Sequence, residues 1–100
     1  MFTAQEARAQ SDQVAMKIAK EFLWNTGSKE IQKAIDKAYY NCNIDITELD
    51  FPERMGPFIV KVLTEEYGFN AKFVSNYEYP VEQYIFVDWS DIPKGDYFSR

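Results

Sequence analysis

The chain lacks histidine altogether and has a single cysteine, Cys42, among its 100 residues. These two counts exclude a Cys/His zinc site, a Ser–His or Cys–His nucleophile pair and a disulfide within the chain. Its four glycines stand alone, so no Gly-rich loop is available to cradle a phosphate. We therefore expect a protein that is not an enzyme and that needs no cofactor or metal.

Long apolar runs are also missing. The longest are a few residues, whereas about 20 are needed to cross a bilayer. The opening Met-Phe-Thr-Ala-Gln-Glu-Ala-Arg has no apolar stretch of the signal-peptide kind. Together with one unpaired cysteine, this predicts no membrane partner and a location in the reducing cytoplasm.

Basic residues are scarce in the second part of the chain. Residues 1–42 carry a net charge of +1, whereas residues 43–100 carry −6. A nucleic-acid binder needs a basic face to displace counterions from phosphates, so we do not expect nucleic acid as a partner, although a basic stripe on the first two helices remains open. A basic protein surface is the more natural complement to the acidic part.

The composition that remains is globular, with 46% hydrophobic and 27% charged residues. A chain of this length makes one domain, here residues 1–100, in which 91–100 read as a C-terminal tail. Thr3 and Glu6 have the spacing of a capping box and predict a helix from about Ala4 to Trp24. We expect Gly27 to end it with a positive φ.

Ser28 is a suitable N-cap for a second helix, whose apolar stripe runs from Ile31 through Ile35 to Cys42. Ile35 lies in the middle of this stripe and is expected in the core. The alternation around Ile44 predicts a short strand over residues 44–47.

A third helix follows, beginning either at Pro52 or, after the Gly-Pro pair, at Pro57, and ending at Gly68. Residues 69–79 and 84–89 are then rich in β-branched and aromatic residues, and a short link containing proline separates them, which predicts a hairpin. The fold class is therefore α+β, in the order α-α-β-α-β-β, with helices packed on a small three-stranded sheet ending in a β-hairpin.

Aromatic residues gather toward the end of the chain, where residues 67–98 hold ten of the seventeen. Those with a polar group suit an interface, and ordinary core packing is the competing interpretation. The candidate interface residues are Tyr77, Tyr79, Tyr84, Trp89 and Tyr97.

Two further groups of residues have a functional and a simpler interpretation. Lys29, Lys33 and Lys37 follow one stripe of the second helix, and with Arg54 they are candidate anion contacts, although a solvated face is the favoured interpretation of the lysines. Four carboxylates within residues 45–53 could in principle hold Ca²⁺, but they lack the spacing of an EF-hand.

Four short segments carry a resemblance to a known group of proteins. They are Thr3-Ala4-Gln5-Glu6-Ala7-Arg8, Asn41-Cys42-Asn43, Tyr67-Gly68-Phe69 and Val87-Asp88-Trp89-Ser90. In these segments, and over roughly residues 3–90, the chain resembles small uncharacterised α/β accessory proteins of tailed bacteriophages. The resemblance implies a gene product that acts in the infected bacterial cytoplasm by binding, and it brings no functional residue with it.

Three functional hypotheses follow. The leading one is a non-enzymatic interaction protein, encoded by a phage, that binds and modulates a host, defence or phage protein. The second is an oligomeric binder of a small nucleotide signal, and the third is an acidic DNA mimic. A three-stranded sheet has two edges that invite pairing, so we also expect a homodimer, with the aromatics of the last two strands or the outer face of the first helix in its interface.

Overall fold

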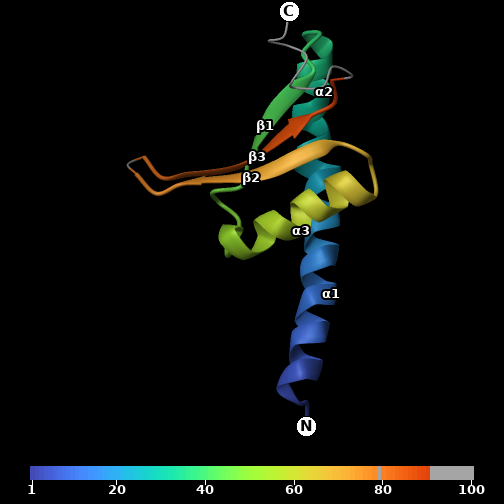
Figure 1. The fold of residues 1–100 in the computed structure, drawn as a ribbon, viewed down its shortest axis with the longest axis vertical. Helices are drawn as coiled ribbons and strands as arrows, with labels where there is room; N and C mark the ends of the chain where they lie inside the picture. The colour runs from blue at the N-terminus through green and yellow to red at the C-terminus, as the bar shows by residue number, and fades with distance from the viewer. Residues whose placement is uncertain (79, 91–100) are drawn as a thin grey trace, which may run out of the picture.

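The computed structural model describes residues 1–78 and 80–90 of the chain, and it has the expected α+β architecture. The elements follow the predicted order α-α-β-α-β-β and end in a hairpin (Figure 1). The expected tail, 91–100, and the candidate residues Tyr79 and Tyr97 lie outside the described residues.

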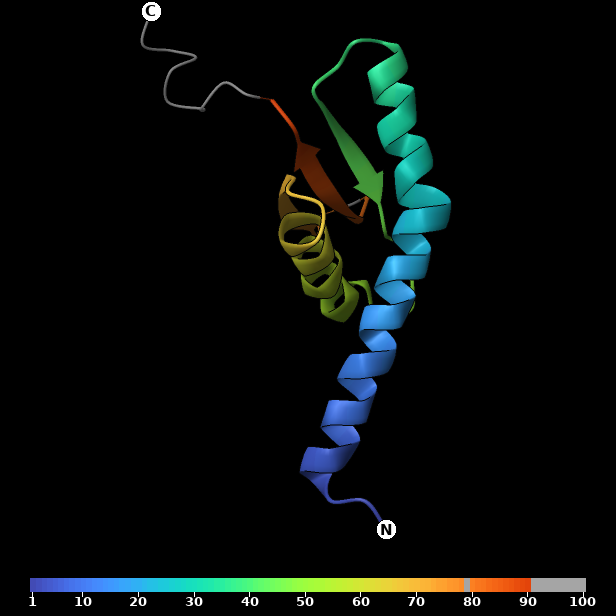
Figure 2. The same ribbon diagram turned by 90° about the vertical axis from the view of Figure 1, so that its right-hand side faces the viewer.

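The first two helices form one continuous rod (Figure 2). Helix α1 (Ala4–Phe22) opens with the predicted capping box and runs into a π-helical turn, η1 (Leu23–Gly27), and then into α2 (Ser28–Asp36). The predicted break at Gly27 was wrong, because this residue has a helical φ of −61°. Its role is close packing: a Cβ on Gly27 would lie 2.8 Å from the side chain of Leu23.

Ser28 also differs from its predicted role as an N-cap. It has helical backbone angles, and its hydroxyl donates a hydrogen bond to the carbonyl oxygen of Trp24 in the preceding turn. Its backbone N–H donates to the carbonyl of Leu23, five residues earlier, which is the bond that defines the wide turn.

The second helix is shorter than predicted, because the chain reverses at Ala38 with a φ of 60°. Cys42 therefore lies in strand β1 (Asn41–Asp45) and not on a helix. The wide turn directs Gly27, Ile31 and Ala34 toward the core and leaves Ile35 at the edge, 49% exposed. The expectation that Ile35 is a core residue was wrong.

Helix α3 (Pro52–Glu65) begins at the earlier of its two predicted starts and continues through Pro57. Proline's φ is compatible with a helix, but Pro57 has no N–H to donate to the carbonyl of Glu53, and its ring crowds that carbonyl. Gly68 ends the unit with a φ of 76°, as predicted.

The sheet has the order β1-β3-β2 and is antiparallel throughout. Strand β3 (Glu82–Asp88) is central and pairs with β2 (Asn70–Asn76) as the predicted hairpin. Alternate residues of β3 face the helices, and Ile85 and Val87 are fully buried there. They pack with Ile44 of β1 and with Ile59 and Leu63 of α3 to form the core.

Candidate functional site

The described residues hold no group of three or more carboxylates and thiols placed to bind a metal. Of the four carboxylates in residues 45–53, Asp45 has a local role: its Oδ1 accepts hydrogen bonds from the backbone N–H of Thr47 at 2.9 Å and from the Thr47 hydroxyl at 2.7 Å. This arrangement caps the turn that follows β1.

The thiol of Cys42 is half-buried on the helix-facing side of β1. Burial, and to a smaller extent the negative charge of Glu30, raises the pKa of Cys42 above its ordinary value of 9.0. A nucleophilic cysteine needs the opposite shift, because the thiolate is the reactive form. Cys42 is therefore suited to packing and not to catalysis.

The four candidate anion contacts do not converge. The three lysines are exposed along α2 and its C-terminal cap, and the Nζ of Lys33 lies 3.2 Å from the Oε1 of Glu30. Arg54 belongs to the first turn of α3, which lies well away from α2 in both ribbon views (Figures 1 and 2). The described residues thus do not combine Arg54 with the lysines into one phosphate-binding site.

The described aromatic candidates fall in three different places. Tyr84 lies on the face of the sheet turned away from the helices, and Tyr77 is 62% exposed in the connection between β2 and β3. Trp89 comes two residues after Val87, so it lies on the same helix-facing side as Ile85 and Val87. It packs edge-to-face on Phe69, with ring centroids 6.0 Å apart.

The face of the sheet turned away from the helices, which we call the open face, has an aromatic centre. Phe86 lies between Asn43 of β1 and Lys72 of β2 in one cross-strand row. Tyr84 occupies the next row, between Asp45 and Val74. The open face therefore carries two adjacent aromatic side chains, both partly exposed and framed by polar groups.

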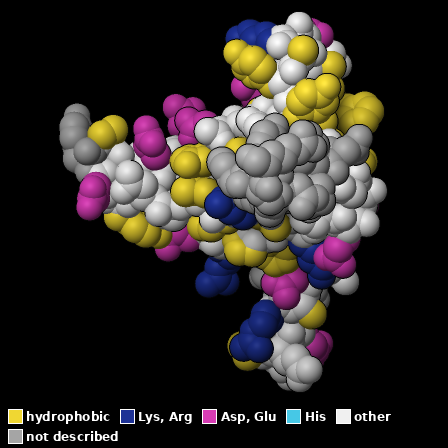
Figure 3. All heavy atoms as spheres, turned by 45° about the horizontal axis from the view of Figure 1, so that its top comes forward, with side chains coloured by type: hydrophobic (Ala, Val, Ile, Leu, Met, Phe, Trp, Pro, Cys, Tyr) yellow, Lys and Arg dark blue, Asp and Glu magenta, His cyan; other side chains and the backbone are white. Residues whose placement is uncertain are grey.

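Acidic groups outnumber basic ones on the open face. Among the described residues, Asp45, Glu82 and Asp88 share it with one base, Lys72, whose Nζ lies 5.9 Å from the centroid of the Phe86 ring. Figure 3 shows hydrophobic and acidic side chains side by side along the projecting hairpin. The open face therefore has an aromatic centre and a mainly acidic border.

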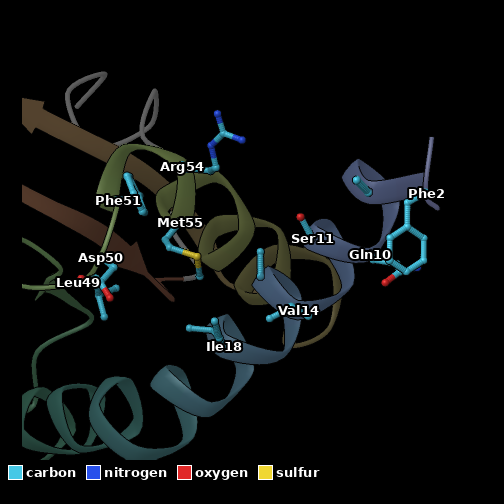
Figure 4. Close-up of a pocket in the computed structure, with 12 residues that line it drawn as sticks. Phe2, Gln10, Ser11, Val14, Ile18, Leu49, Asp50, Phe51, Arg54 and Met55 are labelled. Carbon is cyan, nitrogen blue, oxygen red and sulfur yellow. The ribbon is translucent and has the colours of Figure 1, made fainter. Parts of the chain in front are cut away.

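A second surface, which the sequence analysis missed, runs between α1 and the start of α3 (Figure 4). We call it the arm groove: about 650 Å³ lined on one side by α1, including Val14 and Ile18, and on the other by the segment from Leu49 to Met55. The sequence does carry a signal for it. Residues 4, 7, 11, 14 and 18 follow alternating steps of three and four, which is the heptad spacing of a helix that packs on another helix.

A third, smaller depression lies beside the π-helical turn. Its volume is about 200 Å³, and exposed Trp24 and Tyr67 lie at its border. Ligand pockets usually measure about 300–1,000 Å³, so this depression is the size of a single side chain.

Comparison with protein-family models, with curated proteins and with solved structures finds no match to this chain. Across the two described stretches, none of the helices combines the length and the apolar character that a membrane span requires.

Proposed function

We propose that this protein is a non-enzymatic interaction protein that binds a partner protein through the open face of its sheet. The observation that carries this proposal is the adjacent Tyr84 and Phe86, partly exposed at the centre of the open face. Aromatic residues at the centre of a polar-bordered patch are the usual hot spots of protein interfaces.

The charge of the open face defines the partner further. Three carboxylates against one lysine favour a surface with basic residues around its edge, and they oppose binding to a phosphate backbone. The resemblance to phage accessory proteins implies that the partner is a bacterial host protein, a defence protein or another phage protein. Binding would then modulate the partner by covering its basic surface.

The test compares capture of partners from a bacterial lysate by the wild-type protein and by two open-face variants. Tyr84→Ala removes a central aromatic, and Glu82→Lys reverses a charge at an exposed site at the start of β3. We expect wild type to retain one stoichiometric partner, and each variant to bind the purified partner about 10- to 100-fold more weakly by calorimetry. Wild-type binding should weaken as salt rises, and less so for Glu82→Lys.

Glu65→Lys is the matched control, because it makes the same charge change at an exposed position of α3. It should bind the partner like wild type. The proposal fails if wild type retains no stoichiometric partner, or if both open-face variants bind that partner as tightly as wild type does.

A further inference from the structure

The N-terminal part of α1 forms an arm that extends beyond the rest of the domain (Figures 1 and 2). Every residue from Met1 to Val14 is exposed, and the first residues of α1 that pack against the core are the half-buried Ala15 and Met16. An isolated helix of this length is only marginally stable in water, even with a good cap. The arm thus lacks the packing that normally stabilises a helix.

The arm also exposes large apolar side chains on one side. Val14 is 56% exposed and Ile18 44%, and both line the arm groove. Phe51, across the groove, is 80% exposed and holds a left-handed φ of 52°, which is unfavourable for a bulky residue. Strained and exposed residues of this kind are typical of binding sites.

We propose that a second copy of this chain covers the arm groove, and that the two arms pair antiparallel about a two-fold axis near Ser11. The proposal is independent of the partner that binds the open face. Ser11 lies near the middle of the heptad series from Ala4 to Ile18, so an axis there overlaps the two arms along their full length of about 22 Å.

The charges on the arm favour this antiparallel arrangement. By helical spacing, Glu6 and Lys17 flank the heptad series on one side, and Arg8 and Asp12 flank it on the other. Antiparallel pairing about Ser11 brings Glu6 of one arm within a turn of Lys17 of the other, and Arg8 within a turn of Asp12.

Apolar side chains also lie at both ends of the arm groove, so each end can pack against the opposite end in a second copy. Phe2, 62% exposed, lies at the far end of the arm, whereas Leu49, Phe51 and Met55 lie at the opposite end (Figure 4). Antiparallel pairing carries Phe2 of the second copy to this distant cluster. Because the axis is two-fold, both copies gain the same contact and no groove remains open.

The test is the oligomeric state of the full chain by sedimentation equilibrium across the micromolar range. Wild type should reach twice the monomer mass of 11.7 kDa. Val14→Glu places two carboxylates close to the axis in an apolar interface, and it should raise the dimer dissociation constant by about 100-fold or more. Gln13→Glu, an exposed neighbour outside the heptad series, makes the same charge change and should remain dimeric.

A cysteine crosslink tests the axis separately and keeps the proposal testable if Val14→Glu does not fold. In a Cys42→Ala background, Ser11→Cys should form a disulfide-linked dimer on mild oxidation, whereas Gln13→Cys should not. A wild-type protein that remains a monomer at every concentration would overturn the proposal. So would a dimer that neither Val14→Glu weakens nor Ser11→Cys links, or an arm whose substitution abolishes only the binding of a foreign protein.

Discussion

At the scale of single residues, two residues other than glycine have a left-handed backbone in the described part of the chain. Phe51 precedes α3 and faces the arm groove, where its exposed ring would contact the proposed second copy. Ala38 ends α2, and its small side chain is exposed and has no such use. The backbone N–H of Tyr39 donates to the carbonyl of Ala34 across this reversal, at 2.9 Å. The left-handed conformation of Ala38 is therefore part of the way the helix ends.

Replacing Ala38 with glycine should therefore stabilise the domain. An L-residue costs about 1–2 kcal/mol in the left-handed region, and glycine's greater freedom in the unfolded chain cancels part of that gain. We expect the free energy of unfolding to rise by about 0.5–1 kcal/mol, measured by urea denaturation. Ala34→Gly, at a buried helical position of the same helix, should have the opposite sign, and a loss of stability in Ala38→Gly would contradict this account.

At the scale of elements, the packing of α3 on β2 depends on one missing side chain. Gly56 is buried in α3, and a Cβ there would lie 2.7 Å from a carbon of the Phe73 ring on β2. That Cβ would lie within 3.1 Å of three atoms of the ring, and Phe73 is itself half-buried.

The substitution Gly56→Ala tests this contact. Overpacking of a core contact costs about 1–3 kcal/mol, which exceeds the gain of up to about 1 kcal/mol in helix propensity. We expect a net loss of stability by thermal or urea denaturation. Adding Phe73→Leu should make the alanine less harmful, and the double-mutant cycle should show a coupling energy between the two sites. Simple additivity of the two changes would show that the contact is not limiting.

The elements also show how far local patterns predict this fold. Alternation, capping and turn residues correctly predicted the order of helices and strands, the hairpin and the left-handed Gly68. They failed at Gly27, because a glycine that allows close packing and a glycine that ends a helix look the same in a local pattern. They also missed the reversal at Ala38, which ends the second helix early and places Cys42 in a strand, and Ile35 lies at the edge of the core.

The candidate functional residues were also only partly predictable from the sequence. Tyr84 and Trp89 belong to one aromatic run, but they have opposite parity along the strand, which sends them to opposite faces of the sheet. This difference was available from the sequence. The second side of the arm groove was not, because the segment from Leu49 to Met55 meets α1 only through the tertiary fold.

At the scale of the whole molecule, the two proposed interaction surfaces are separate. The open face lies on the side of the sheet away from the helices, whereas the arm groove lies between two helices. A dimer formed through the arms would therefore leave both open faces accessible. Two identical faces on one particle would strengthen binding to an oligomeric partner through multivalency, without any new contact.

This division of the molecule predicts two classes of backbone stability. Amide hydrogens of β3 should exchange slowly at all protein concentrations, because this strand is central in the sheet and packs on the core. Residues in the arm, from about 7 to 14, are all exposed, so in the monomer their amides should exchange nearly as fast as in an isolated helix.

Dimer formation should slow amide exchange in the arm and leave amide exchange in β3 unchanged. Hydrogen exchange followed by mass spectrometry, at concentrations below and above the dimer midpoint, should show the arm becoming protected in wild type, while Val14→Glu remains unprotected at both. The peptide that covers β3 serves as the internal control, because its exchange should not differ between concentrations. Arm protection that is already complete in the dilute monomer would mean that the helix is stable without a second copy, and it would remove the energetic reason for the arms to pair.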